Sequence, residues 1–275
     1  MPITMNVLVT SGVNATGYIN HVKHSHLVPQ GPANFDLVDP KHDFVIHAHG
    51  SGFKYMHGVL RAGAVTSFDV EQAGVATLDV TLAPALKASA FAGSGFANYF
   101  TNTRYVFNGN DGNDSFKSGH GGDLLLGGKG GDNLDGNIGN DRVEGGEGDD
   151  TLNGNRGNDT IIGGLGRDTL SGGKDRDKFV FNDVAESVVG PDHDVIINFH
   201  RSQRDKIVLA GIDADISQTG DQAFTFIGSN DFGSVAGQLR FSGGLLQGDT
   251  DGDGAADFEV AVLNVGALAA GDFVL

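Results

Sequence analysis

Apolar and polar positions recur with a period of nine through the middle of the chain. From Gly109 to Val180 the sequence divides without a gap into eight nonapeptides: GNDGNDSFK, SGHGGDLLL, GGKGGDNLD, GNIGNDRVE, GGEGDDTLN, GNRGNDTII, GGLGRDTLS and GGKDRDKFV. Position eight is always apolar and holds Phe116, Leu125, Leu134, Val143, Leu152, Ile161, Leu170 and Phe179. A short strand that turns one apolar side chain inward, followed by a polar loop, predicts stacked strands with a shared interior.

Strand-like runs separated by Gly, Asp or Asn lie on both sides of the repeat. The runs before it are MNVLVT, NFDLV, DFVIHA, AVTSFDV and ATLDVTL, with a short helix expected over 84–90. The runs after it are DVIINF, DKIVL, AFTFIG, GQLRF and DFEVAVL. We therefore predict an all-β chain in three parts: an N-terminal β-domain over 1–106, the repeat over 107–181, and an antiparallel β-domain over 182–275.

Position six of every nonapeptide is an aspartate. The column consists of Asp114, Asp123, Asp132, Asp141, Asp150, Asp159, Asp168 and Asp177. Gly or Asn prevails at positions one, two and four, where it permits positive φ and a tight turn that points backbone carbonyls inward. Ca²⁺ takes six to eight oxygen ligands at roughly 2.3–2.6 Å, more than one loop supplies, so a stacked neighbour has to complete the site. A flexible glycine-rich linker or a phosphate-binding loop explains these columns poorly.

The nonapeptides resemble the RTX (hemolysin-type) calcium-binding repeat, whose pattern is G-G-x-G-x-D-x-apolar-x. The resemblance implies a parallel β-roll in which two nonapeptides make one turn and each ion lies between loops two repeats apart. Carbonyls of positions one and three with the aspartate of one loop would meet carbonyls of positions two and four with the aspartate of the other. Eight repeats then hold about six Ca²⁺ ions. Ser118 at position one and Asp175 at position four depart from the pattern in outer repeats.

The ligands implied by this resemblance are firmest in repeats three to seven. Besides the aspartates, they are Gly127, Gly128, Lys129, Gly130, Gly136, Asn137, Ile138, Gly139, Gly145, Gly146, Glu147, Gly148, Gly154, Asn155, Arg156, Gly157, Gly163, Gly164, Leu165 and Gly166.

Residues 179–275 are similar to the C-terminal domain of serralysin-type metalloproteases. The likeness is carried by FVFNDVAES, DVIINF, DKIVLAGID, FIGSNDF, GQLRF, GDTDGDGAADFEV and DFVL. In that family the segment accompanies export by a type I secretion apparatus, and an acidic residue followed by three apolar ones closes the chain. The resemblance thus implies a secreted, extracellular protein that folds when it meets calcium, with 272–275 as part of the export signal.

A second kind of metal site is expected in the acidic loop that contains Asp249, Asp251, Asp253 and Asp257. Acids at alternate positions before a glycine can wrap one cation, as in an EF-hand loop. Val260 stands where an EF-hand has its bidentate Glu, and the residues that follow read as a strand. One further Ca²⁺ ion and a solvated acidic turn both remain open.

Charge and composition exclude several classes of binding partner. The net charge is −17, and residues 109–275 carry 29 acids against 12 bases. Such a surface disfavours nucleic acid and anionic lipid, which both need clustered Lys and Arg. No apolar run is long enough for a transmembrane helix, so no membrane insertion is expected. The chain has no cysteine, which leaves packing and oxygen-ligated ions to stabilise it outside the cell.

The N-terminal part carries seven of the ten histidines, including the i, i+2 pairs His24/His26 and His47/His49. Such pairs share a strand face and can hold zinc or copper, although polar histidines on a solvated sheet face are the simpler explanation. The chain has no H-E-x-x-H, no G-x-S-x-G and no Cys nucleophile, so no catalytic residue is assigned. We expect a noncatalytic calcium-binding protein. The alternatives are an adhesion or matrix module that binds a polysaccharide or cell surface through 1–106, and a small metal-dependent enzyme or metal scavenger.

Overall fold

The computed structural model describes the backbone of residues 4–9, 26–29, 34–39, 44–56, 59–72, 75–87, 104–109 and 111–275, and side chains from residue 106 onward. In this part of the chain the secondary structure consists of β-strands and short 3₁₀ helices. None of its helices has the length and apolar character that crossing a membrane requires.

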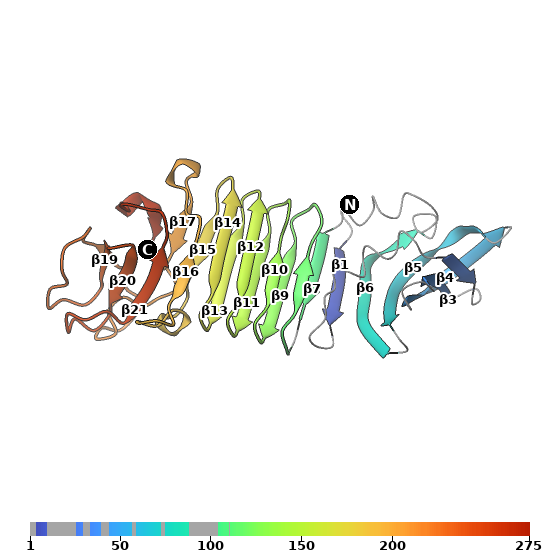
Figure 1. The fold of residues 1–275 in the computed structure, drawn as a ribbon, viewed down its shortest axis with the longest axis horizontal. Helices are drawn as coiled ribbons and strands as arrows, with labels where there is room; N and C mark the ends of the chain where they lie inside the picture. The colour runs from blue at the N-terminus through green and yellow to red at the C-terminus, as the bar shows by residue number, and fades with distance from the viewer. Residues whose placement is uncertain are drawn as a thin grey trace.

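The strands before β7 (Arg104–Asn108) form the antiparallel end of a 13-stranded sheet that continues into the repeat. They are β1 (Thr4–Val9), β2 (His26–Pro29), β3 (Asn34–Asp39), β4 (Phe44–Met56), β5 (Val59–Gln72) and β6 (Val75–Lys87). β1 lies between β6, to which it is antiparallel, and β7, to which it is parallel. Strand β1 thereby joins the N-terminal sheet to the repeat (Figure 1).

The helix expected over 84–90 is wrong for residues 84–87, which continue strand β6. Pairing with β5 overrides the local helix preference there: Leu86 lies opposite Val65, and Lys87 lies opposite Ala64. The register between the two strands shifts before this point, so Pro84 sits in an irregular stretch where a ladder N–H is dispensable.

The repeat folds as the expected parallel β-roll. Its strands are β8 (Ser115–Lys117), β9 (Leu124–Lys129), β10 (Asn133–Asp135), β11 (Arg142–Glu147), β12 (Thr151–Arg156), β13 (Thr160–Leu165), β14 (Thr169–Lys174) and β15 (Lys178–Val180). Successive strands alternate between two sheets, so each strand pairs with the one 18 residues away: Val143 lies between Leu125 and Ile161, for example. Two nonapeptides therefore make one turn, and all eight position-eight side chains are at most 1% exposed in the interior.

The two sheets continue beyond the repeat. The later elements are η3 (Val184–Glu186), β16 (Asp194–Ile196), η4 (Arg201–Gln203), β17 (Lys206–Val208), β18 (Thr225–Phe226), β19 (Gln238–Ser242), β20 (Leu245–Asp249), β21 (Phe258–Val262), η5 (Ala270–Asp272) and β22 (Phe273–Val274). β16 adds in parallel to β14, and β17 adds in parallel to β15. The roll pattern therefore runs past residue 181 without a break in either sheet.

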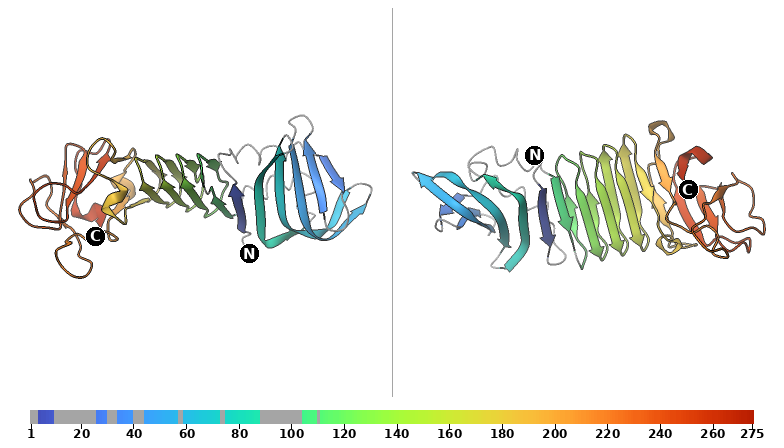
Figure 2. Two further views of the ribbon diagram at one scale, coloured as in Figure 1. Left: turned by 90° about the horizontal axis from the view of Figure 1, so that it is seen from below. Right: turned by 180° about the vertical axis from the view of Figure 1, so that it is seen from behind.

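The C-terminal part is antiparallel in β19, β20 and β21, as expected, while β16, β17 and β22 keep the parallel pairing of the roll. The N-terminal sheet, the roll and the C-terminal strands follow one another along the long axis of the molecule (Figure 2). Phe181 and Phe258 pack edge to face with ring centroids 5.3 Å apart, and so join the end of the roll to the C-terminal core.

Candidate metal centre

The aspartates of position six form two columns, one on each side of the roll. The odd column, from repeats one, three, five and seven, contains Asp114, Asp132, Asp150 and Asp168; the even column contains Asp123, Asp141, Asp159 and Asp177. All eight side chains are at most 2% exposed. In each column the backbone N–H of one aspartate donates to Oδ1 of the next, 18 residues on, at 2.7–3.0 Å. The columns are therefore built by the stacking of the roll itself.

The second carboxylate oxygen is left without a hydrogen-bond donor along much of both columns. Among the described residues this holds for Oδ2 of Asp132, Asp141, Asp150, Asp159, Asp168 and Asp177. A buried carboxylate oxygen with no partner is costly, and buried charges are normally paired or bound to metals. These oxygens thus fit a row of cations along each side of the roll.

Burial has a clear effect on the protonation of these groups. Desolvation raises the pKa of Asp132, Asp159 and Asp168 to about 6, of Asp150 and Asp177 to about 7, and of Asp141 to about 8. Hydrogen bonds from the preceding aspartate of the column lower these values, whereas neighbouring aspartates raise several of them. A bound cation would reverse this balance by stabilising the ionised form.

Position one was expected to need glycine for a positive φ. The structure shows instead that a larger residue would collide with neighbouring atoms there. A Cβ on Gly145 would lie 2.0 Å from Oδ2 of Asp150 and 2.6 Å from the carbonyl oxygen of Gly163. Positive φ is instead confined to positions two and four within repeats three to seven, as at Gly146 (118°) and Gly148 (131°). The missing side chain at position one keeps an aspartate oxygen and a backbone carbonyl close together, as an oxygen cage needs.

The carbonyls of position three hold adjacent loops of a column together. The N–H of Gly130 donates to the carbonyl of Glu147 at 2.7 Å, and the N–H of Gly139 donates to that of Arg156 at 2.9 Å. A carbonyl oxygen has a second lone pair, so these groups still have capacity for a cation. The side chains of position three lie outside the loops, where Lys129 and Glu147 form an exposed ion pair at 2.6 Å and Leu165 is 49% exposed.

In repeats three to seven, loops two repeats apart stack and their aspartates form one column. The backbone carbonyls named as ligands in these repeats stay a prediction. Sequence reasoning missed the two residues that extend the columns. Oδ1 of Asp194 accepts from the N–H of Asp168 at 2.8 Å, and Oδ1 of Asp205 accepts from the N–H of Asp177 at 3.0 Å. The spacing of aspartate and buried apolar residue two positions later is kept in Asp194/Ile196 and Asp205/Ile207, and this was the available signal.

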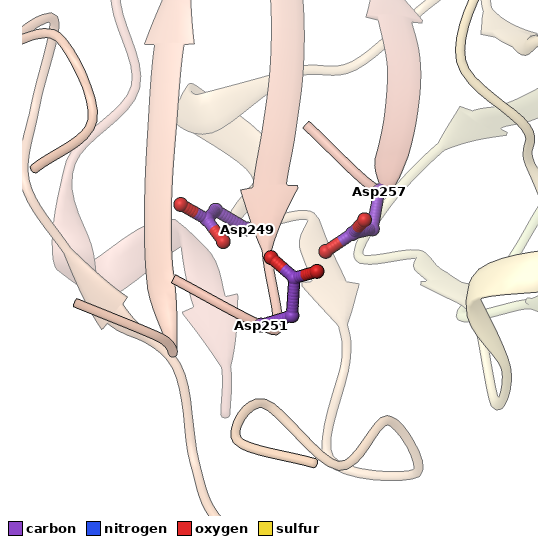
Figure 3. Close-up of side chains that lie close together, drawn as sticks. All are labelled: Asp249, Asp251 and Asp257. Carbon is purple, nitrogen blue, oxygen red and sulfur yellow. The ribbon is translucent and has the colours of Figure 1, made fainter. Parts of the chain in front are cut away.

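The acidic loop after β20 brings together three of its four predicted ligands. Carboxylate oxygens of Asp249, Asp251 and Asp257 lie within 4.8 Å of one another, whereas Asp253 is not part of this group (Figure 3). Asp249 is fully buried and accepts from the N–H groups of Gly252 and Gly254. Oδ2 of Asp257 accepts from the N–H and hydroxyl of Thr250. The loop thus has local hydrogen bonds of its own as well as converging carboxylates.

The paired histidines of the N-terminal part stay a prediction. His47 and His49 are two positions apart in β4, and His26 begins β2, whereas His24 lies outside the described residues.

Comparison with known proteins identifies the repeat. Residues 108–143 and 144–179 match the family model of the RTX calcium-binding nonapeptide repeat. The β-roll of this chain is therefore a calcium-binding module, and Ca²⁺ is the ion that the aspartate columns fit. Among curated proteins, a search found no match to the chain.

One solved structure that matches is the solution structure of a subunit of the mannuronan C5-epimerase from Azotobacter vinelandii. It is 26% identical in sequence, the match covers 60% of this chain and 80% of that one, and the TM-score is 0.28.

Proposed function

We propose that this protein is a secreted calcium-binding protein whose β-roll closes only when extracellular Ca²⁺ enters the aspartate columns. The observation that carries the proposal is the set of buried Oδ2 atoms without hydrogen-bond donors, repeated along both sides of the roll. In the folded, calcium-free chain each carboxyl would either be an uncompensated buried charge or have to take up a proton at a pH well above its ordinary pKa, and both oppose folding near neutral pH. Calcium supplies the compensation and so couples binding to folding.

The ion positions follow from the RTX resemblance together with the observed stacking. Four loops stack on each side, which leaves three gaps per side and about six Ca²⁺ ions in the repeat. In each gap the aspartates of both loops and their carbonyls at positions one to four would supply the ligands. The acidic loop at Asp249, Asp251 and Asp257 is proposed to hold one more ion, because those three carboxylates converge.

We assign a separate role to each of the three predicted parts of the chain. We propose that residues 107–181 bind calcium, that residues 182–275 cap the roll and carry the export signal, and that residues 1–106 supply a β-domain whose sheet continues into the roll through β1 and β7. In the folded chain the acidic residue of the predicted signal, Asp272, is 9% exposed and contacts Arg201 at 2.7 Å, and β22 pairs with β17. We propose that the secretion apparatus reads 272–275 before folding, while calcium is scarce.

A calcium titration of the full chain tests the proposal. We expect far-UV circular dichroism to show a cooperative gain of β-structure as Ca²⁺ rises through about 10⁻⁴–10⁻³ M, the range of extracellular calcium modules. Mg²⁺ at equal concentration is the control, because its small, rigid octahedral shell suits these loops poorly. A spectrum that is insensitive to calcium would overturn the proposed switch.

Export needs its own test. In a bacterium with a type I secretion apparatus, the full chain should reach the medium, and Asp272→Ala with Phe273→Ala should reduce its appearance there. A matched change at the exposed surface, Asp221→Ala, should leave export unchanged. Equal secretion of all three proteins would refute the role of this segment.

A further inference from the structure

The antiparallel strands at the N-terminal end of the long sheet have one apolar and one polar face. Strands β3, β4, β5, β6 and β1 lie side by side (Figure 1), and their pairing aligns the alternation of their sequences. Two neighbouring rows on one face are apolar throughout: Phe35, Ala48, Phe68, Val80 and Val7, and Leu37, Ile46, Val70, Leu78 and Val9. Antiparallel sheets commonly bury one face and keep the other polar, so register and sequence pattern agree here.

The polar face carries a row of acidic positions around a histidine. Asp36 in β3 lies opposite His47 in β4, and His47 lies opposite Asp69 in β5. Asp69 in turn lies opposite Asp79 in β6. Directly opposite residues of an antiparallel pair share a face, and their Cβ atoms are about 4.5–5.5 Å apart. Four adjacent strands therefore place three acids and one histidine in a single row.

The neighbouring row on the same face adds a second histidine. His49 is two positions from His47 in β4, so both belong to one face of the sheet. It lies opposite Asn34 in β3 and Ser67 in β5. The register shift between β4 and β5 begins only after His49, so it does not separate the two histidines. The pair is thus flanked on each side by a strand that contributes an aspartate.

The fixed charges of this row have one sign. Asp69 and Asp79 are directly opposite, and like charges in that position destabilise a sheet. The Lys and Arg residues of β1–β6 are Lys54, Arg61 and Lys87, and none of them lies in either polar row. Hydration would explain a polar face, but it does not favour carboxylates aligned across strands. A bound cation would relieve the repulsion.

We propose that Asp36, His47, His49 and Asp69, which the register places together on three adjacent strands, bind one Zn²⁺ ion. Zn²⁺ takes four ligands and is bound by histidine nitrogen and carboxylate oxygen, the donor types that meet here. Ca²⁺ takes oxygen ligands, so this site differs in kind from the aspartate columns. The inference goes beyond the proposed function and is independent of it, because none of the four residues belongs to the roll.

A zinc titration of the full chain at saturating Ca²⁺ tests the inference. Excess Ca²⁺ occupies the oxygen-ligated sites, so calorimetry with Zn²⁺ should show one ion per chain, and elemental analysis after dialysis should give the same ratio. His47→Ala should weaken zinc binding by about tenfold or more, since losing even a hydrogen-bond partner of a metal ligand costs that much. His120→Ala, at an exposed position of the roll, is the matched control and should bind zinc like the unsubstituted protein.

Two variants in β3 test whether the polar face is required. Asp36→Asn and Asp39→Asn remove the same charge from the same strand, but only Asp36 shares a face with His47. Asp36→Asn should weaken zinc binding by about tenfold or more, and Asp39→Asn should leave it unchanged. Circular dichroism at the same Ca²⁺ concentration checks that each variant is folded. If His47→Ala does not fold, the two nearly isosteric aspartate variants decide the question.

Two results would overturn the inference. One is a folded protein that binds no zinc at saturating Ca²⁺. The other is equal zinc affinity in Asp36→Asn, Asp39→Asn and the unsubstituted chain, which would assign the metal to other histidines. A chain that bound zinc as expected but no calcium would support the inference and contradict the proposed function, so the two failures are distinguishable.

Discussion

The backbone N–H of Asp150 donates to Oδ1 of Asp168 at 2.8 Å, although the two residues are 18 positions apart. This contact spans one full turn of the roll, so the same carboxylate takes part in the ladder and faces the gap between two loops. Oδ1 stabilises the stack, and Oδ2 is left for the ion. The stacking that orders the aspartates therefore also positions the oxygens that we propose as calcium ligands.

Asp150→Asn should separate these two roles. The amide keeps an oxygen that can accept from Asp132, but its NH₂ group cannot ligate Ca²⁺. Because Asp150 borders two gaps of the odd column, we expect the loss of up to two ions and a higher calcium midpoint for folding. Asp149→Asn, an exposed change of equal charge at position five, should preserve both values. Equal ion counts in the two variants would contradict the column model.

Gly145→Ala tests the space at position one. The added Cβ would meet Oδ2 of Asp150 at 2.0 Å and the Gly163 carbonyl at 2.6 Å, so both oxygens must move apart. We expect calcium affinity to fall by tenfold or more, as measured by calorimetry. Gly266→Ala is the control, since a Cβ there meets nothing within 4 Å. Wild-type affinity in Gly145→Ala would show that position one takes no part in the cage.

Leu152→Ala tests the shared interior. Leu152 is fully buried and lies opposite Leu134 and Leu170 in the neighbouring turns. Truncation of a buried leucine costs about 2–5 kcal/mol. Urea unfolding in saturating calcium should show a loss of that size, whereas Leu165→Ala, at a 49% exposed position, should change stability by no more than about 0.5 kcal/mol. A small effect at Leu152 would mean that the ions alone stabilise the roll.

Much of this architecture could be predicted from the sequence because the nine-residue period shows which positions of each repeat are equivalent. Asp at position six and an apolar residue at position eight fix the inward and loop-facing positions, and the structure places Asp150 and Leu152 accordingly. The ends were harder to predict. Asp194 and Asp205 follow loops without the glycine pattern, so their one sequence signal is the apolar residue two positions later, and the long-range hydrogen bonds show that they continue the columns.

The role of position one shows a second limit. Gly145 was expected to provide positive φ, but its φ is not positive. Glycine is needed there because a Cβ would collide with Oδ2 of Asp150 and the carbonyl oxygen of Gly163. The Gly163 contact exists only once the roll is stacked. Residues 84–87 show the same effect in a strand, because pairing with β5 overrides the local preference. A sequence pattern shows which residue types recur at a position. The contact that requires a given residue type there can come from a residue one turn of the roll away.

Asp251→Asn tests the acidic loop after β20. Asp251 belongs to the converging group with Asp249 and Asp257, whereas Asp253 carries the same charge in the same loop and does not. If the loop binds Ca²⁺, Asp251→Asn should lose one ion, and Asp253→Asn should bind the same number as the unsubstituted protein. Identical ion counts in both variants would identify the loop as a solvated acidic turn.

Protons should partly replace calcium in the roll. Burial raises the pKa of the six column aspartates from Asp132 to Asp177 from 3.8 to between about 6 and about 8, and that of Asp194 to about 9. A group whose pKa is higher in the folded state contributes stability that is fully present below its unfolded pKa and is lost as the pH rises through its folded pKa. The calcium-free fold should therefore weaken progressively between pH 5.5 and 9.

Circular dichroism of the metal-free chain checks this expectation. β-Structure should increase as the pH falls from 9 to 5.5, which stays above the sequence pI of about 4.7. In saturating calcium the same scan should be nearly flat above pH 7, because the ions compensate the ionised carboxylates. Asp141→Asn, which removes a group with a pKa of about 8, should flatten the metal-free curve. If the metal-free chain instead lost β-structure on acidification, charge repulsion in the columns would not be what keeps it unfolded.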